Sequence, residues 1–443
     1  MLIQSRIMNK ETTGSILKIG MIAFLMVMFM AVAASADVDS GSVEIVNESG
    51  ANDIFDSIQA AINAAEDGDT IVVNEGTYKE SLSITKEGLT IQGMDQDNVI
   101  IDASDKSGYA ISVEASNVSL ESFTLVGTGD QTHGYGIKVG PESNGILIYD
   151  ISVKDSQRTA IDLHGVSDAL VKDVHVFGVA SGNGIAVTDS EDVVIDGAVT
   201  DSNAWGGIAL YTSGNYVDAG IRNIAIINCL FSNEQNGIYL HDSADAGENA
   251  FVDISIIDNA FNNNSIQIST INKDKIPSYV SDINFNDLAE ENTFDLSVVV
   301  LDEESKIKVP VIFSSIQDAI GAAEAGDTIE VSEGTYNDDL TIDKASLTIR
   351  SLSGPAETTI MGATVKVAAD DVTIDGFTID NEGGERVVGP GSTSNTTIKN
   401  NVLVNSMRGI QGDWYGIPAD LTILNNVFKR SMGLLELRVC LIY

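Results

Sequence analysis

The stretch SIQAAINAAEDGDTIVVNEGTY occupies residues 57–78, and residues 315–336 read SIQDAIGAAEAGDTIEVSEGTY, with 17 of 22 positions identical and no gap. In both copies the apolar residues recur at the spacing of one face of an amphipathic α-helix. The stripe comprises Phe55, Ile58, Ala61, Ile62 and Ala65 in the first copy and Phe313, Ile316, Ala319, Ile320 and Ala323 in the second. We therefore expect helices over residues 54–66 and 312–324, each stopped by a Gly-Asp-Thr turn that leads into a strand.

A finer repeat lies between residues 109 and 265. Six segments, YAISV, YGIKV, TAIDLH, NGIAVT, GGIALY and NGIYLH, each place a small residue before an isoleucine. These isoleucines are Ile111, Ile137, Ile161, Ile185, Ile208 and Ile238, at spacings of 26, 24, 24, 23 and 30 residues. A second run of alternating polar and apolar residues follows each of them. Two or three short strands per repeat, separated by polar turns, are typical of one coil of a solenoid.

Stacking of such coils explains the repeated helix. Stacked coils pair strand on strand at roughly 4.8 Å and enclose a continuous interior of Ile, Val, Leu and Phe. Asn-rich turns such as FSNEQN and IKNNVLVN favour ladders of stacked side-chain amides. The end of a solenoid exposes unpaired strand edges and needs a cover, so we interpret the repeated helix as a cap and not as a catalytic motif.

The sequence thus predicts an all-β chain of two tandem β-helical modules, each with an N-terminal capping helix. The first module spans residues 37–295, a linker spans 296–311, and the second module spans 312–443. The second module stops in mid-pattern at GLLELRVCLIY, so we expect it to be incomplete.

On these segments the chain resembles the right-handed parallel β-helix proteins of the pectate-lyase-like superfamily. Within that superfamily it is similar to secreted and cell-surface proteins of archaea and bacteria that begin with SIQ.AI..A..GDTI.V..GTY, and the resemblance covers roughly residues 50–430. It implies two right-handed parallel β-helices. It does not imply one activity, because this fold carries lyases, hydrolases, epimerases, adhesins and non-catalytic surface modules.

The N-terminus points to an exported protein. Basic residues precede the apolar run Ile19–Ala34, and Ala34-Ser35-Ala36 matches a signal-peptide cleavage site, so we expect residues 1–36 to be removed. An uncleaved N-terminal anchor is the alternative, and no later stretch is apolar enough to span a membrane.

With 65 acidic and 24 basic residues the net charge is −41, which disfavours nucleic acid and anionic lipid as partners.

The strands of the finer repeat present two columns of side chains outward, because alternate residues of a strand face opposite sides. Alignment of the coils gives one column of Ser112, Lys138, Asp162, Ala186, Ala209 and Tyr239, and a second of Glu114, Gly140, His164, Thr188, Tyr211 and His241. We expect an exposed face there, with Trp205 at the turn that enters it. Aromatic rings stack on sugar faces while polar groups bond hydroxyls. The predicted ligand-binding residues are Asp162, His164, Trp205, Tyr211, Tyr239 and His241. Ordinary cross-coil pairing, as between Lys138 and Asp162, is the alternative.

This face holds an incomplete set of catalytic groups. Glycoside hydrolysis usually needs two carboxylates flanking the bond, and the columns offer Asp162 with no second carboxylate nearby. A lyase needs a base and a cation that stabilises the enolate. Lys138 and His164 are candidate bases and Asp162 a candidate Ca²⁺ ligand, although one carboxylate makes a poor site for a hard cation. The chain lacks the polygalacturonase motif series and the DPHD of alginate epimerases; the nearest fragment is DLHG at 162–165.

A second candidate Ca²⁺ site is the loop DSADAGENA, where Asp242, Asp245 and Glu248 supply carboxylates, with an ordinary solvated loop as the alternative. No other cofactor is required.

We expect an exported cell-surface or extracellular protein that binds polysaccharide, or an envelope glycan or protein, without catalysis. The alternative is a polysaccharide-active enzyme, a lyase rather than a hydrolase. An accessory β-helix that helps to mature a metal site is a third hypothesis, disfavoured because Met, Cys and His do not cluster.

Overall fold

The computed structural model describes residues 41–46, 52–141, 143–213, 220–243, 250–270, 285–302, 311–362, 364–384, 386–411 and 420–429. These residues fall into two compact units, the first reaching Ala260 and the second beginning at Phe261. The predicted signal peptide, residues 303–310 of the predicted linker and residues 430–443 lie outside the described residues. The module limits given above therefore stay predictions.

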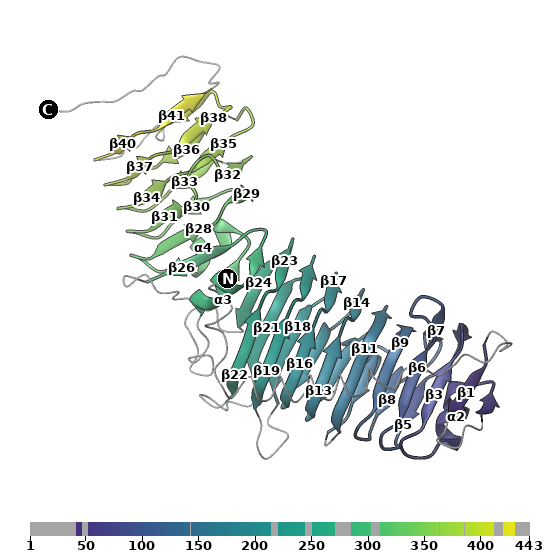
Figure 1. Ribbon diagram of the computed structural model, residues 1–443. Helices are drawn as coiled ribbons and strands as arrows, with labels where there is room; N and C mark the ends of the chain where they lie inside the picture. The colour runs from purple at the N-terminus through teal and green to yellow at the C-terminus, as the bar shows by residue number, and fades with distance from the viewer. Residues whose placement is uncertain are drawn as a thin grey trace, which may run out of the picture. The chain divides into compact units, whose positions relative to one another are not determined.

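The first unit is a stack of coils, each contributing two or three short strands that pair in parallel with those of the next coil (Figure 1). The first strand series comprises β3 (Thr70–Val73), β6 (Thr90–Gly93), β9 (Ser119–Val126), β11 (Asn144–Lys154), β13 (Ser167–Lys172), β16 (Glu191–Asp196), β19 (Ile221–Ile227) and β22 (Phe251–Ile257). The second comprises β4 (Gly76–Tyr78), β7 (Val99–Asp102), the long β9 and β11 again, then β14 (His175–Phe177), β17 (Val199–Asp201) and β20 (Leu230–Ser232).

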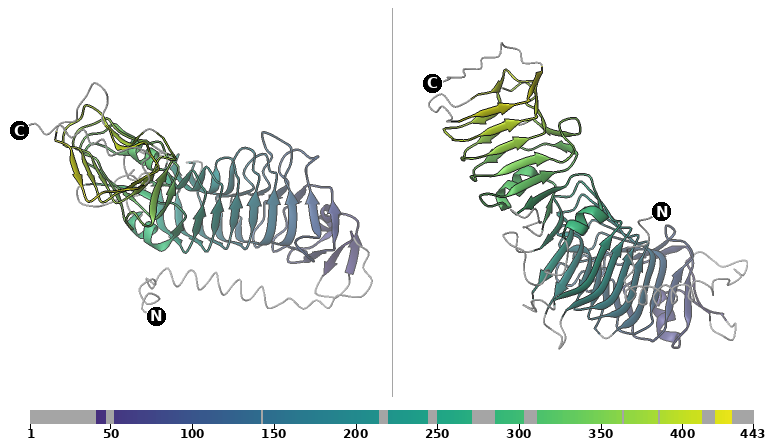
Figure 2. Two further views of the ribbon diagram at one scale, coloured as in Figure 1. Left: turned by 90° about the horizontal axis from the view of Figure 1, so that it is seen from above. Right: turned by 60° about the vertical axis from the view of Figure 1, so that its left-hand side comes forward.

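The third series carries the small-Ile segments. It comprises β5 (Leu82–Ile84), β8 (Ile111–Val113), β10 (Ile137–Val139), β12 (Ile161–His164), β15 (Asn183–Thr188), β18 (Gly206–Thr212) and β21 (Asn236–Asp242). The six isoleucines pair one above another and each is 0 % exposed, so they line the interior. The coils stack side by side in both views of Figure 2, and the predicted parallel β-helix is confirmed.

Polar residues turn the chain between strands. Aspartate and asparagine occupy many positions with positive φ, such as Asp173 at 51° and Asn228 at 54°, because their short side chains tolerate the left-handed region. The amide of Asn228 donates to Asp196 one coil earlier at 2.8 Å. In the second unit, Asn426 Oδ1 accepts a 2.9 Å hydrogen bond from the backbone nitrogen of Asn401. The Asn401 amide also donates to Asn426 Oδ1 at 3.2 Å, which is a side-chain amide pair between coils of the kind predicted.

The second unit repeats the design with shorter strands. Its first parallel series comprises β28 (Thr328–Val331), β31 (Thr348–Ser351), β34 (Thr373–Asp375), β37 (Thr397–Lys399) and β40 (Thr422–Leu424). The second comprises β29 (Gly334–Tyr336), β32 (Thr358–Met361), β35 (Thr378–Asp380), β38 (Val402–Val404) and β41 (Val427–Lys429). The third comprises β30 (Thr341–Ile342), β33 (Val365–Val367), β36 (Arg386–Pro390) and β39 (Arg408–Ile410). Before them come β24 (Ile266–Thr270), α3 (Phe285–Glu291), β25 (Thr293–Phe294) and β26 (Val298–Leu301), while β23 (Ala260–Asn262) spans the division between the units along the chain.

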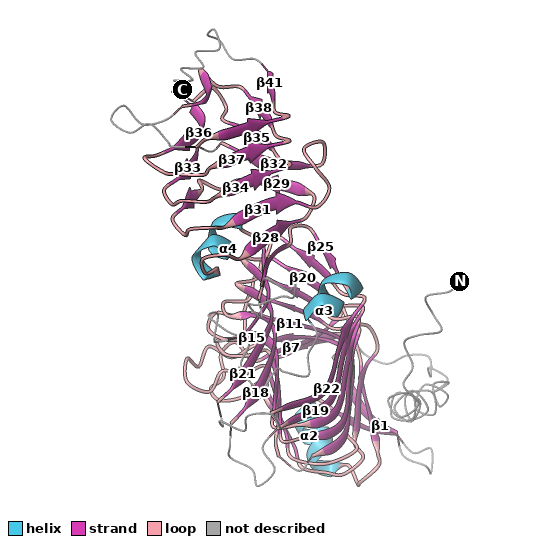
Figure 3. Cartoon of the chain, turned by 90° about the vertical axis from the view of Figure 1, so that its left-hand side faces the viewer, coloured by secondary structure: helices cyan, strands magenta, loops and turns pink. Residues whose placement is uncertain are grey.

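Each repeated segment forms a helix, but a shorter one than predicted. The helices are α2 (Ile58–Ala64) and α4 (Ile316–Ala322), drawn in cyan in Figure 3. The predicted limits of 54–66 and 312–324 are wrong, because Ser57 and Ser315 cap the N-termini and the residues before them are extended. Those residues form β2 (Asn52–Phe55) and β27 (Ile312–Phe313).

An antiparallel strand precedes each cap and was not predicted. It is β1 (Val43–Val46) in the first unit and β26 in the second. β1 pairs antiparallel with both β2 and β3, and β26 pairs in the same way with β27 and β28. Each cap is therefore a helix with a pair of antiparallel strands, placed against the first parallel strand of its solenoid.

Side chains from the first coil fasten each helix at both ends. Glu80 accepts hydrogen bonds from Ser57 Oγ at 3.1 Å and from the backbone nitrogens of Ile58 and Gln59, each at 2.9 Å. Lys86 donates to the carbonyl oxygens of Asn63 and Ala65 at the other end. Asp338 and Lys344 repeat these contacts on α4. A carboxylate at the N-terminus and an ammonium at the C-terminus also match the helix dipole.

We expect Glu80→Ala to destabilise the first cap by about 1–3 kcal/mol, because three donors lose their acceptor. Hydrogen exchange at the amides of α2 should accelerate accordingly. Glu75→Ala, which removes an exposed carboxyl group from the preceding turn, is the control and should leave this exchange unchanged. Equal protection in the two variants would contradict the fastening described here.

Candidate functional site

The strand register places the two predicted columns as expected. Lys138 lies between Ser112 and Asp162, and Asp162 stands beside Ala186. In the second column the order His164, Thr188, Tyr211, His241 runs across β12, β15, β18 and β21. The alignment of coils by their isoleucines therefore gave the correct neighbours, because parallel coils pair in register.

Three predicted residues form a compact polar cluster. The ammonium of Lys138 lies 2.6 Å from Asp162 Oδ2 and 3.3 Å from His164 Nδ1. The side chains of Lys138 and Asp162 are only 17 % and 9 % exposed. Burial, and then the Lys138 charge, lower the pKa of His164 against the opposing effects of Asp162 and Asp189. The cross-coil pair of Lys138 and Asp162 is thus present, and a largely neutral imidazole lies beside it.

The predicted exposed face is wrong in its middle part. Asp162 is 6 % exposed, Thr188 is 8 % exposed, and Ala186 and Ala209 are also buried. Side chains on adjacent coils stand roughly 4.8 Å apart, so each large residue covers a small neighbour. Only Trp205 among the predicted ligand-binding residues is well exposed, at 45 %.

Three rings meet at the other end of the columns. The ring centres of Tyr211 and Tyr239 lie 5.9 Å apart, and His241 lies 5.9 Å from Tyr211 and 5.8 Å from Tyr239. The Tyr211 hydroxyl accepts a 2.9 Å hydrogen bond from Asn183, and burial raises its pKa. Burial likewise lowers the pKa of His241. These half-buried rings therefore pack on one another in edge-to-face and tilted contacts.

Two functional candidates were missed, and with Trp205 they form a surface that we call the Arg158 platform. It consists of Tyr135, Arg158 and Trp205. The Arg158 guanidinium lies 5.7 Å from the ring centre of Tyr135 and 5.6 Å from that of Trp205. Within the described part of the chain it makes no ion pair, and its Nε has no hydrogen-bond partner. The platform thus pairs an exposed indole with a cation that forms no ion pair with any described residue, in a chain of net charge −41.

Glycine makes the platform possible. Arg158 and Trp205 belong to coils that are not adjacent, and Gly182 occupies the coil between them. A Cβ at Gly182 would lie 2.5 Å from the Thr159 nitrogen and 3.1 Å from the Arg158 carbonyl carbon. Without a side chain at this position the guanidinium and the indole can meet over the intervening coil.

The sequence contained a signal for this platform. Tyr135 stands two residues before its strand isoleucine, and Arg158 and Trp205 stand three residues before theirs. The isoleucine spacing sets the register of the strands, whereas these three residues lie in the turns that enter them. Lys138, 5.4 Å from the Tyr135 ring centre, links the platform to the polar cluster.

Asp189 was also missed. It follows the second column directly, is 9 % exposed, and accepts hydrogen bonds from the backbone nitrogen of Ser213 at 2.9 Å and from the Ser213 hydroxyl. Its charge acts on His164. The polar cluster therefore has a second carboxylate nearby, and Ser213 holds it in place. Ser213 lies after the end of its strand, so the alignment of strand residues does not reveal this contact.

The predicted Ca²⁺ loop is only partly described. Asp242 accepts a hydrogen bond from Thr212, while Asp245 and Glu248 lie outside the described residues. Across the residues that the structure does describe, no group of three or more His, Cys, Asp or Glu side chains is placed to hold a metal ion. In the same residues, no helix is long and apolar enough to cross a bilayer.

Comparison with known proteins gives distant structural resemblances. No family model and no curated protein matches the chain. The solved structures that resemble it include the mannuronan C-5 epimerase AlgE4 A-module of Azotobacter vinelandii, with 16 % identity, a TM-score of 0.36, and coverage of 86 % of this chain and 92 % of that one. PfbA, a surface adhesin of Streptococcus pneumoniae, shows 15 % identity, a TM-score of 0.37, and coverage of 85 % and 87 %. A GH87 α-1,3-glucanase of Streptomyces thermodiastaticus shows 14 % identity, a TM-score of 0.37, and coverage of 83 % and 64 %.

Proposed function

We propose that this chain is an exported protein of the cell surface or extracellular space that binds polysaccharide at the Arg158 platform and does not cleave it. The observation that carries the proposal is the 45 % exposed Trp205 ring with the Arg158 guanidinium 5.6 Å from its centre. An indole offers a flat face for a sugar ring, and a guanidinium offers donors for hydroxyl or carboxylate oxygens. No nucleic acid partner is proposed, because of the strong negative charge.

The polar cluster supports binding over turnover. Lys138 is engaged by Asp162 at 2.6 Å, and the Asp162 side chain is 9 % exposed. Each group already has a partner, so neither is presented to a substrate in the described structure. A general base must come within hydrogen-bond reach of the proton that it removes. We therefore assign Lys138 and Asp162 to holding the coils in register beneath the platform.

Replacing Trp205 by alanine tests this proposal. Binding to a panel of neutral and acidic polysaccharides, measured by affinity electrophoresis, should weaken about ten-fold or more for the polymer that the wild-type chain retains. Arg158→Met, which removes the guanidinium and keeps an unbranched side chain, should weaken binding as well. Met94→Ala removes another exposed apolar side chain, 54 % exposed, and should change nothing. Equal retention of the Trp205 and Met94 variants would refute the assignment.

A polysaccharide lyase is the second candidate, favoured by the contact of Lys138 with both Asp162 and His164. Because the pKa of His164 is lowered, its imidazole is neutral at pH 7 and can accept a proton from the carbon next to a uronate carboxylate. Lys138, or Ca²⁺ bound near Asp162, would then stabilise the enolate. The enolate would collapse to the C4–C5 double bond as the glycosidic C4–O bond breaks, and the departing oxygen would take a proton from water. The signature is absorbance of an unsaturated uronate, lost in His164→Ala. Turnover that survives this substitution would exclude this assignment.

A further inference from the structure

The two caps match strand by strand, which allows their surroundings to be compared. In the first unit β1 pairs with β2 so that Val43 stands opposite Phe55. In the second unit β26 pairs with β27 so that Val298 stands opposite Phe313. Ile54-Phe55 and Ile312-Phe313 occupy the same place before the N-cap serine of each helix. The edge of β2 that faces away from β1 therefore corresponds to the edge of β27 that faces away from β26.

That edge is paired in the second cap, whereas among the described residues it has no partner strand in the first. β24 pairs antiparallel with β27, with Ile266 opposite Phe313 and Ile268 opposite Ile312. Beside this strand Ile312 is 0 % and Phe313 2 % exposed. In the first cap Ile54 is 66 % exposed, and among the described residues β2 pairs with β1 alone.

We propose that the open edge of β2 docks a β-strand from another polypeptide, a strand that carries apolar side chains at alternate positions as β24 does. An edge strand presents unpaired N–H and C=O groups, which a further strand satisfies, and alternate side chains give specificity. Ile54 and Phe55 hold the positions of Ile312 and Phe313, which stand opposite Ile268 and Ile266 in the second cap.

The charges beside the edge define the partner further. Asp53 and Asp56 flank Ile54-Phe55 and are exposed, whereas Val311 and Ser314 hold these places in the second cap. Two carboxylates disfavour an acidic strand and favour one with a lysine or arginine near the residue opposite Asp53. The incoming strand thus shares the Ile-x-Ile pattern of β24 and adds a positive charge that β24 lacks.

Disulfide capture tests the docking with the whole chain. In a Cys440→Ser background, Ile54→Cys is incubated under mildly reducing conditions with the peptide NSIQCST, which is residues 264–270 with Ile268→Cys. Directly opposed residues of antiparallel strands have Cα atoms about 4.5–5.5 Å apart, within the range of a disulfide. Cys229 is 1 % exposed and does not compete. The same peptide with Ile266→Asp, which removes the contact to Phe55, is the matched control.

We expect the apolar peptide to be captured about ten times more than the Ile266→Asp peptide, and a further Ser269→Lys change to raise capture. Met94→Cys, at another exposed apolar position, should capture both peptides equally and weakly. Equal capture of the two peptides at residue 54 would overturn the proposal. Capture at residue 54 no greater than at residue 94 would also overturn it, as would occur if the chain's own residues before Gly41 covered the edge.

Discussion

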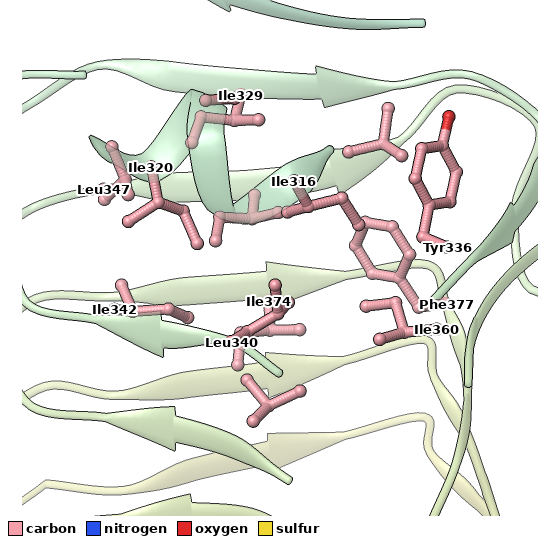
Figure 4. Packing of buried hydrophobic residues seen from close by; sticks show 14 of the residues in the cluster. Ile316, Ile320, Ile329, Tyr336, Leu340, Ile342, Leu347, Ile360, Ile374 and Phe377 are labelled. Carbon is pink, nitrogen blue, oxygen red and sulfur yellow. The ribbon is translucent and has the colours of Figure 1, made fainter. Parts of the chain in front are cut away.

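Replacing Ile320 by aspartate is expected to unfold the cap of the second unit, with a loss of about 4 kcal/mol or more in the free energy of unfolding. Ile320 is 1 % exposed and lies in one apolar cluster with Ile342 and Leu347 from the first coil (Figure 4). A carboxylate at this position has no partner in that cluster and leaves the space of a large side chain unfilled. This apolar cluster is therefore the structural reason why the helical stripe recurs in the repeated sequence.

Gly321→Asp is the matched control for this substitution. Gly321 is the next residue of the same helix, and a Cβ added there meets nothing within 4 Å. Hydrogen exchange at the amides of β28 and β31 should rise steeply in the Ile320 variant and stay near wild type in the Gly321 variant. Similar exchange in both would show that the helix does not protect the first coils.

Glu234→Gln is expected to raise the free energy of unfolding of the first unit relative to wild type, and this gain should increase with pH. Glu234 is 1 % exposed, and its carboxyl group accepts hydrogen bonds from the Asn203 backbone at 2.9 Å and side chain at 2.8 Å. Burial raises its pKa from the ordinary 4.5 to about 7. Between these two pKa values the glutamate is ionised in the unfolded chain but still protonated in the folded chain. The free energy of unfolding therefore falls as pH rises from about 4.5 to about 7.

The full effect is about 3 kcal/mol, reached above pH 7, because each pKa unit corresponds to about 1.4 kcal/mol. The measurement is the difference in urea midpoint between Glu234→Gln and wild type at several pH values from 4.5 to 8. That difference should grow with pH and then level off. The exposed Glu75→Gln variant should show no such trend, and a flat difference for Glu234→Gln would contradict the burial argument.

The solenoid could be predicted because the residues that face its interior recur at a regular spacing in the sequence. One isoleucine per coil fixes the register, and the register fixes which outward residues are neighbours, such as Lys138 with Asp162. The ends of the cap helices were not predictable from the apolar stripe, because Phe55 continues the helical spacing while lying in a strand. The N-cap serine decides the boundary there.

The candidate site was only partly predictable. Column order follows from the sequence, but exposure depends on the size of side chains one coil away, so Asp162 is buried although it faces outward. The Arg158 platform depends on a glycine between two coils and on turn geometry. Such a contact is visible in a sequence only if the turns are aligned as carefully as the strands.

The central claim is that the first unit binds polysaccharide without cleaving it. The most direct measurement is to incubate the chain with the polysaccharide panel, with and without Ca²⁺, and to follow both retention and the absorbance of unsaturated uronates. We predict retention that depends on Trp205, with no rise in absorbance in either condition. A rise in absorbance that is abolished by Asp162→Ala or Lys138→Ala would contradict this account and make the polar cluster an active site.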